Sequence, residues 1–295
     1  MNYYNEIKTK LIENENYARI KDYSKERYKL NTYYEVGRML SDAGKRYGEG
    51  VIKEYSIKLT RELGKGYTQS RLRYIRRFYE VFSKCPTMSD KLSYSHYCEI
   101  IWLAETQINY YITITIINNL TVRELRQRIK NKEYERLDES AKLKLTNQEQ
   151  PTILELIKNP IIIKTNKQYS KISEKDLQNI ILENISAFLK ELGNNFSFIE
   201  NEYKIKLGDR YNYIDLLLYN IEYNCYVVIE LKLTELKKEY IGQIETYMNY
   251  IDANLKTINQ DKTIGIIICK KDNQFIMEYC SDPRILSREY LIKNY

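Results

Sequence analysis

Apolar residues in the first part of the chain recur every three or four positions, which is the period of an amphipathic helix. The pattern predicts six helices, over residues 3–20, 24–42, 49–63, 69–83, 95–119 and 121–136. A Gly-Lys-Gly sequence at 64–66 ends the third helix, and Thr68 or Ser70 can cap the fourth. In the fifth, the β-branched run 112–117 makes a strand the alternative.

The pattern changes after residue 172. A helix is predicted from Ser173, which can form a capping box with Asp176, to Gly193. Shorter apolar runs then predict strands at about 197–206, 213–220, 224–233 and 263–269, a helix at 235–253, and a short helix or strand near 274–280. The order helix, three strands, helix, strand is typical of an α/β sandwich with a mixed central sheet.

The two patterns indicate two domains. Residues 1–140 are predicted to form a helical domain, and residues 173–295 an α/β domain. Residues 141–172 are predicted to connect them, because this segment contains a polar run and two prolines, Pro151 and Pro160. The predicted fold class is therefore an α domain followed by an α/β domain.

Two of the predicted strands carry charged residues inside apolar runs. Asp215 lies in the run 213–219, and Glu230 and Lys232 lie in the run 226–233. Charges buried in a core must be paired or must bind a metal ion, since an isolated buried charge is too costly. Side chains two apart on a strand share a face, so Glu230 and Lys232 point the same way. A hairpin between the two strands would bring Asp215 to them.

Two carboxylates and one ammonium in a cleft suit a phosphodiesterase that uses a divalent metal. Carboxylate oxygens hold Mg²⁺ or Mn²⁺, while water and substrate phosphate fill the other positions. The metal lowers the pKa of a bound water, and a nearby lysine orients that water or stabilises the developing charge. The alternative is an ordinary ion pair at a sheet edge. The apolar neighbours and the second carboxylate favour the metal site.

The excess of positive over negative charge lies entirely in the first half of the chain. Residues 1–150 contain 28 Lys and Arg against 20 Asp and Glu, a net charge of +8. Residues 151–295 contain 19 against 20, a net charge of −1. This asymmetry indicates a domain that binds a polyanion, joined to a domain with a different task.

The predicted helix 69–83 carries the candidate contacts to nucleic acid. Arg73, Arg76 and Arg77 share a face at i, i+3 and i+4, and Arg71 adjoins them. A helix, a glycine turn and an Arg-rich helix follow one another in helix-turn-helix and winged-helix DNA-binding domains. An arginine face that is merely solvated is the alternative.

Histidine and cysteine usage excludes several kinds of site. The chain has one histidine, His96, so zinc sites with several histidine ligands and zinc deaminases are disfavoured, and a structural role is expected for it. The cysteines are Cys85, Cys98, Cys225, Cys269 and Cys280. They show no C-x-x-C spacing, which fits a reducing cytoplasm. Neither a membrane span nor a signal peptide is expected.

Several of these segments resemble a known family. The second half is similar to the PD-(D/E)XK nuclease superfamily, whose core is a helix, a three-strand meander, a helix and a further strand. The whole chain resembles the bacterial YhcG-like family, which adds an N-terminal helical domain associated with DNA binding. The similar stretches are 33–37, 66–82, 92–97, 188–193, 213–232, 242–247 and 264–270. Ile214 replaces a frequent proline and Tyr94 a usual tryptophan, and neither change touches the charged set.

The resemblance implies roles for five residues in the site. Asp215 and Glu230 correspond to metal ligands, and Lys232 to the catalytic lysine. Gln243 and Tyr247 match a Q-x-x-x-Y signature on the following helix, where they lie one turn apart. This match implies that Gln243 assists catalysis and that Tyr247 borders the bound nucleic acid, with helix packing as the alternative.

A further acidic residue supports the metal in some relatives of this fold. Glu183 is the residue expected to correspond to it, and Glu191 competes for the same assignment. Taken together, the resemblance implies a Mg²⁺- or Mn²⁺-dependent endonuclease. Double-stranded DNA is the expected substrate, held by the basic N-terminal domain, and a homodimer would cut both strands. A non-catalytic DNA-binding protein and an RNA-directed nuclease are the alternatives.

Overall fold

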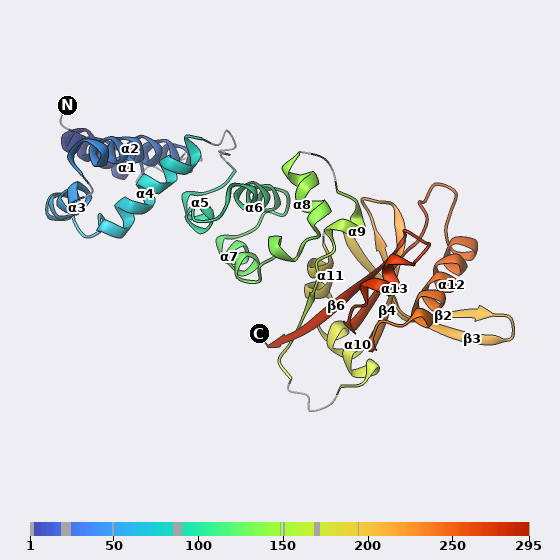
Figure 1. Cartoon of the computed structure of the whole chain (residues 1–295). Helices are drawn as coiled ribbons and strands as arrows, with labels where there is room; N and C mark the ends of the chain where they lie inside the picture. The colour runs from blue at the N-terminus through green and yellow to red at the C-terminus, as the bar shows by residue number, and fades with distance from the viewer. Residues whose placement is uncertain are drawn as a thin grey trace. The chain divides into compact units, whose positions relative to one another are not determined.

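The structure is a computed structural model that divides into two compact units, Met1–Tyr134 (unit 1) and Glu135–Tyr295 (unit 2) (Figure 1). The residues it describes are 3–18, 25–48, 50–84, 89, 91–147, 149, 151–167, 172–193 and 195–294. None of the helices in this part of the chain combines the length and the apolar character needed to span a bilayer.

The regular secondary structure in the described residues of unit 1 is helical, as the period of its sequence predicts. Its helices are α1 (Tyr3–Ala18), α2 (Lys25–Tyr47), α3 (Gly50–Leu63), α4 (Gln69–Phe82), α5 (Tyr94–Ile100), α6 (Glu105–Ile117) and α7 (Val122–Lys130). The predicted helix 95–119 is thus two helices, and the β-branched run 112–117 is helical. Burial of Ile108, Tyr111 and Ile112 overrides the strand propensity of that run. With no strand among its described residues, unit 1 shows no wing.

Helices α2 and α4 pack closely because α2 has a glycine at the contact. A Cβ atom on Gly37 would come 2.4 Å from the carbonyl oxygen of Ile75 and 2.7 Å from Cβ of Tyr79. Helix α4 begins after Thr68, whose hydroxyl accepts a hydrogen bond from the Arg71 amide at 3.3 Å, as the sequence predicts. The residues that α4 buries are Leu72, Ile75, Phe78 and Phe82.

Unit 2 contains a six-stranded mixed sheet in the order β1-β6-β5-β4-β3-β2. The strands are β1 (Ile161–Thr165), β2 (Phe196–Leu207), β3 (Arg210–Asn220), β4 (Cys225–Glu235), β5 (Ile264–Lys271) and β6 (Ile285–Asn294). Strands β2, β3 and β4 form an antiparallel meander, and β4, β5, β6 and β1 pair in parallel. The predicted α/β sandwich with a mixed sheet is therefore confirmed.

Helices cover both faces of this sheet. The helical segments of the unit are η1 (Tyr134–Arg136), α8 (Glu139–Thr146), α9 (Ile153–Leu156), α10 (Glu174–Glu183), α11 (Ile185–Leu192), α12 (Lys238–Asn254) and α13 (Gln274–Glu278). Alternate residues of β4 belong to two cores: Val227 and Ile229 pack with α10 and α11, and Val228 packs with α12. The single helix predicted from 173 to 193 is divided at Asn184 into α10 and α11.

The segment 141–172, expected to connect the domains, supplies β1 to the sheet of unit 2. The sequence pattern also missed β6, which pairs with both β1 and β5. Polar residues inside β6 explain the omission. Arg288 in β6 is only 6% exposed, and its Nε donates a hydrogen bond to the Ile157 carbonyl at 2.9 Å. The Arg288 guanidinium finds its hydrogen-bond partner in a distant segment of the chain, and the hydrophobic pattern of the sequence does not predict such a contact.

Helix α12 lies directly on the sheet because β5 contains a glycine. A Cβ atom on Gly265 would come 2.5 Å from Sδ of Met248 and 2.9 Å from Cδ1 of Ile244. Contact this close leaves the helix little freedom to move relative to β5. Gln243, a predicted site residue, immediately precedes Ile244 in α12 and is therefore held over the sheet.

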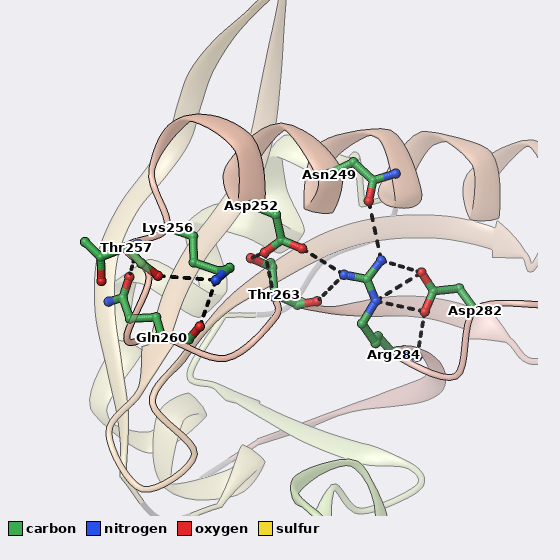
Figure 2. A network of polar contacts seen from close by, with 8 residues as sticks. All are labelled: Asn249, Asp252, Lys256, Thr257, Gln260, Thr263, Asp282 and Arg284. Carbon is green, nitrogen blue, oxygen red and sulfur yellow. Dashed lines mark hydrogen bonds and ion pairs between the residues drawn. The ribbon is translucent and has the colours of Figure 1, made fainter.

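A network around Arg284 fixes the C-terminal end of α12 (Figure 2). Arg284 Nη1 donates to Asp252 Oδ2 at 2.9 Å, and Nη2 donates to Asp282 Oδ2 at 2.6 Å. The amide and hydroxyl of Thr263 donate to Asp252 Oδ1 at 2.8 and 2.6 Å. These bonds tie the end of α12 to the residues that precede β5 and β6.

Candidate active site

Asp215 lies where strand β3 leaves strand β4. The β3–β4 pairing runs from Asn220 to Leu216 and stops there, while β3 continues to pair with β2. In place of the next ladder bond, Asp215 Oδ2 accepts a hydrogen bond from the Leu231 amide at 2.7 Å. Its carbonyl oxygen accepts one from Gln178 Nε2 of α10 at 2.8 Å. Backbone and side chain of Asp215 are thus both fixed.

Glu230 and Lys232 are buried beside it, with 2% and 8% of their surfaces exposed. Lys232 Nζ donates to Glu230 Oε1 at 2.7 Å. Gln243 Nε2 donates to the same oxygen at 2.8 Å. The other oxygen, Glu230 Oε2, is buried and has no hydrogen-bond partner among the residues that the structure describes. The two-residue alternation along β4 therefore does place Glu230 and Lys232 together, and Gln243 joins them.

Burial makes the two carboxylates unfavourable in their charged forms. It raises the pKa of Glu230 to about 7, and the negative charge of Asp215 adds to the effect. Burial also raises the pKa of Asp215, although the Leu231 amide and the Lys232 charge act in the opposite direction. Burial of Lys232 works against its charged form, but the Glu230 carboxylate outweighs it, so the Lys232 pKa is raised. A cation would relieve the repulsion between the carboxylates.

Tyr247 supports Gln243 and is too buried to contact nucleic acid. Its side chain is only 5% exposed and packs in the core beneath α12. Its hydroxyl accepts a hydrogen bond from Gln243 Nε2 at 3.0 Å. The spacing of one helical turn placed the two residues on one face, and inward packing of the Tyr247 ring agrees with the alternative of helix packing. The expected nucleic-acid contact at Tyr247 is therefore replaced by a positioning role.

Glu174, and not the expected Glu183, is the acidic residue of α10 that lies next to the cluster. Its Oε2 atom lies 3.7 Å from Lys232 Nζ, and its charge raises the pKa of both Asp215 and Glu230. It is the first residue of α10, whereas Glu183 is the last and pairs with Lys167. Nine residues of helix separate the two by about 14 Å.

Glu191, the competing candidate, is also outside the cluster. Its carboxylate pairs with Arg136 and accepts a hydrogen bond from the Ile162 amide at 3.0 Å, which anchors β1. Glu174 could have been found from its position, because it directly follows the cap Ser173 and so starts the helix. The expectation for Glu183 failed because the register of the helix against the sheet is not visible in the sequence.

Asp215 and Glu230 fit a divalent metal of the Mg²⁺ or Mn²⁺ type. Within the described residues, no three His, Cys, Asp or Glu side chains are grouped closely enough to hold a metal alone. Such ions need only one or two protein carboxylates, because water and phosphate complete their coordination. The buried, unpaired Oε2 atom of Glu230 is the observation that favours an ion, since an uncompensated anionic oxygen is costly.

The four arginines of α4 differ in their contacts. Arg71 is held within unit 1, because it donates to the Gly66 carbonyl at 2.9 Å and to the Tyr33 hydroxyl at 2.6 Å. Arg73 is exposed and makes no ion pair or hydrogen bond with any residue that the structure describes. Of the two, Arg73 is the one available to a phosphate.

The other two arginines are partly engaged. Arg76 Nε pairs with Glu80 at 2.7 Å. The Arg77 guanidinium lies 5.5 Å from the centre of the Trp102 ring, and its Nε donates to the Ile101 carbonyl at 3.3 Å. The predicted arginine face is thus only partly free.

His96 is structural, as its isolation in the sequence predicts. It closes the capping box of α5, where its Nδ1 accepts a hydrogen bond from the Ser93 amide at 3.2 Å. Its Nε2 lies 3.0 Å from the Leu120 carbonyl. The described cysteines, Cys98, Cys225, Cys269 and Cys280, are free thiols, and Cys85 lies outside the described residues.

Comparison with known proteins gives matches over both units. Residues 154–294 match the family described as "YhcG PDDEXK nuclease domain", and residues 8–136 match the "DUF1016 N-terminal domain". A protein of Escherichia coli (strain K12) named "Putative nuclease YhcG" is 23% identical over 283 residues. That alignment covers 81% of this chain and 76% of the relative.

Two solved structures match a smaller part of the chain. A repair endonuclease from Pyrococcus abyssi is 18% identical, with 42% of this chain and 49% of that chain covered and a TM-score of 0.30. An EndoMS–dsDNA complex is 16% identical, with 42% and 48% covered and a TM-score of 0.31. This chain thus spans about half of each, and likeness at this level supports no inference about activity.

Proposed function

We propose that this chain, whose two units match the family models of YhcG-like proteins, is a metal-dependent nuclease whose active site contains Asp215, Glu230, Lys232 and Gln243. The proposal rests chiefly on one observation. The Asp215 and Glu230 carboxylates adjoin a buried lysine, and Glu230 Oε2 has no hydrogen-bond partner within the described part of the chain. Such a cluster is unfavourable without a further cation. The family match supplies the class of reaction, hydrolysis of a phosphodiester bond.

Each residue has a task that its contacts support. Asp215 and Glu230 would hold Mg²⁺ or Mn²⁺, which when bound activates water and neutralises charge on the phosphate. Lys232 Nζ is held by its hydrogen bond to Glu230 Oε1, and its positive charge would stabilise the negative charge that develops on the scissile phosphate. Gln243 orients the Glu230 carboxylate, and Tyr247 orients Gln243. Glu174 holds the Lys232 ammonium from the opposite side.

Double-stranded DNA is the substrate we propose, bound through the basic first half of the chain. The net charge of +8 in residues 1–150 suits contacts to phosphate, which are independent of sequence. Arg73, exposed on α4, is the first of these contacts. We further propose that two copies act together on the two strands of a duplex, and that the protein works in the cytoplasm, where its free thiols would persist.

A cleavage assay tests the proposal. Purified protein is incubated with supercoiled plasmid, linear duplex, single-stranded DNA and RNA, each with Mg²⁺, Mn²⁺ or EDTA. We expect nicking of plasmid with either metal and none in EDTA. Salt-sensitive DNA binding without cleavage under any condition would contradict the enzyme and favour a binding protein. Cleavage of RNA alone would contradict the DNA substrate.

A further inference from the structure

Strands β2 and β3 continue beyond the rest of the sheet as a two-stranded ribbon. From Arg210 to Asp215, β3 pairs with β2 alone, because its pairing with β4 begins only at Leu216. Six residues of strand correspond to about 20 Å. Figure 1 shows the two strands running past α12 to a tight turn. Gly208 in that turn has a φ of 62°, a conformation that a two-residue hairpin turn requires.

The free ribbon, defined as residues 202–214, has two faces of opposite character. On one face, Ile205 and Ile214 are fully buried and belong to the core beneath α12, with Tyr203 and Leu207 packed beside them. On the other face, alternate residues are exposed: Lys204, Lys206, Tyr211 and Tyr213. The buried face holds the ribbon in place, so the exposed face is presented on a rigid support.

The exposed face combines two lysines with two tyrosines. The register places Lys204 opposite Tyr213 and Lys206 opposite Tyr211. Tyr211 and Tyr213 are 55% and 51% exposed, although aromatic rings of this size are usually more buried. Lys204 Nζ lies 3.9 Å from the centre of the Tyr211 ring. Positive charge therefore adjoins aromatic surface along the whole strip.

The strip leads to the candidate active site. Tyr213 precedes Asp215 by two residues, a distance of about 7 Å along the strand. Glu202, at the base of the ribbon, is paired with Lys175 of α10 at 2.5 Å, so its charge does not oppose an approaching anion. A polymer bound along the strip would pass directly to Asp215.

We propose that this strip binds unpaired nucleotides next to the bond to be cut, with bases stacked on Tyr211 and Tyr213 and phosphates bound by Lys204 and Lys206. Open aromatic faces beside lysines are the means by which proteins hold single-stranded nucleic acid without reading its sequence. Bases within a duplex are already stacked and cannot use such rings. The proposed substrate is thus duplex DNA that carries a single-stranded segment next to the bond to be cut, such as a fork, flap or gap. This proposal deepens and rests on the nuclease function above.

Binding in EDTA tests the strip independently of cleavage. Fluorescence anisotropy is measured with a single-stranded oligothymidine and with a blunt duplex, for the wild type and for Tyr211→Ala/Tyr213→Ala. We expect the double variant to bind the single strand at least about tenfold more weakly, since each stacked base contributes about 1–3 kcal/mol. Its affinity for the duplex should change less than twofold. Tyr279→Ala, at an 84% exposed tyrosine that directly follows α13, is the matched control and should resemble the wild type.

The contribution of Lys204 and Lys206 is tested by a different quantity, the salt dependence of single-strand binding. In Lys204→Ala/Lys206→Ala, the slope of log affinity against log salt for the single strand should be smaller by about 1.4, the value for two lost phosphate contacts. Unchanged single-strand affinity in the tyrosine variant, or an equal loss on single strand and duplex, would overturn the proposal. If the wild type cleaves no substrate but the tyrosine variant shows the selective loss, the nuclease function fails and the strip remains.

Discussion

Two clusters of charged residues lie toward opposite ends of helix α12, and they differ in how completely their charges are satisfied. Around Arg284, hydrogen bonds from the guanidinium hold the pKa of Asp282 below its usual range. Asp252 accepts bonds from both Arg284 and Thr263. Around Glu230 the opposite holds. Burial raises the pKa of Glu230 to about 7, and one of its oxygens accepts no hydrogen bond from any described residue.

The difference separates a structural role from a functional one. A charged network that is complete in the folded protein stabilises the contacts it bridges. A buried cluster that remains unfavourable after folding is expected where a ligand later compensates it. We therefore assign the Arg284 network to the stability of α12 and the Glu230 cluster to metal and substrate. Substitutions at Lys232, Arg284 and Asp215 can break or sharpen this distinction, and a further pair on α4 tests the DNA contacts.

The largest effect is expected for Lys232→Ala. Removing the ammonium should lower the rate of metal-dependent cleavage by about 10²–10³-fold, because Lys232 supplies charge stabilisation in a buried site. The fold should persist, as judged by circular dichroism. Lys271→Ala, at a lysine with 69% of its side chain exposed at the end of β5, is the matched control and should cleave normally. A folded Lys232→Ala protein with wild-type activity would remove Lys232 from the mechanism.

Arg284→Ala should lower stability and leave cleavage unchanged, the opposite of Lys232→Ala. The substitution leaves Asp252 and Asp282 without their shared partner, so we expect the free energy of unfolding to fall by about 2–3 kcal/mol. Urea denaturation measures this loss. Cleavage per folded molecule, assayed well below the melting temperature, should be unchanged. Loss of cleavage with unaltered stability would mean that the network belongs to the active site.

Asp215→Asn should stabilise the metal-free protein at alkaline pH. Burial raises the Asp215 pKa, so its carboxyl favours the folded state most at acid pH and loses that contribution as pH rises through the raised value. Asparagine keeps the acceptor for the Leu231 amide and removes the charge. We expect a gain in the free energy of unfolding at pH 8 that shrinks as the pH falls, measured by urea unfolding in EDTA. A variant less stable at pH 8 than at pH 5, relative to wild type, would contradict this.

The smallest effect concerns the arginines of α4. Arg73→Ala should weaken duplex DNA binding a few-fold and reduce the salt slope by about 1, without loss of stability. Arg71→Ala should instead lower the melting temperature, because Arg71 ties the turn at Gly66 to Tyr33. Anisotropy and thermal melts of the two variants separate these roles. Identical behaviour of the two variants would mean that contacts within unit 1 do not decide which arginine binds DNA.

Much of the candidate site could be predicted from the sequence because strand alternation is a strict rule. Charges inside apolar runs marked Asp215, Glu230 and Lys232, and two-residue spacing placed the last two together. The helical spacing of Gln243 and Tyr247 placed them on one face of the helix, one turn apart. These relations join residues two to four positions apart, so the geometry of a single strand or helix determines them and the packing of distant segments does not.

The relations that failed are long-range ones. Glu183 and Glu174 lie on the same helix, and only the docking of α10 against the sheet decides which of them reaches Lys232. Tyr247 was expected to border the bound nucleic acid, with helix packing as the alternative, and its ring is buried in the core beneath α12. Strand β6 was missed because Arg288, a residue that a sequence pattern treats as exposed, is buried by partners more than 100 residues away.

The central claim is that the carboxylates of Asp215 and Glu230 bind a divalent metal ion. Calorimetric titration with Mn²⁺ at pH 8 tests it most directly, because it measures that binding. Metal-free wild-type protein is compared with Asp215→Asn, Glu230→Gln and the control Asp282→Asn. We expect saturable binding to the wild type and the control, and at least about tenfold weaker binding to the other two. Equal Mn²⁺ affinity in all four proteins would contradict the account.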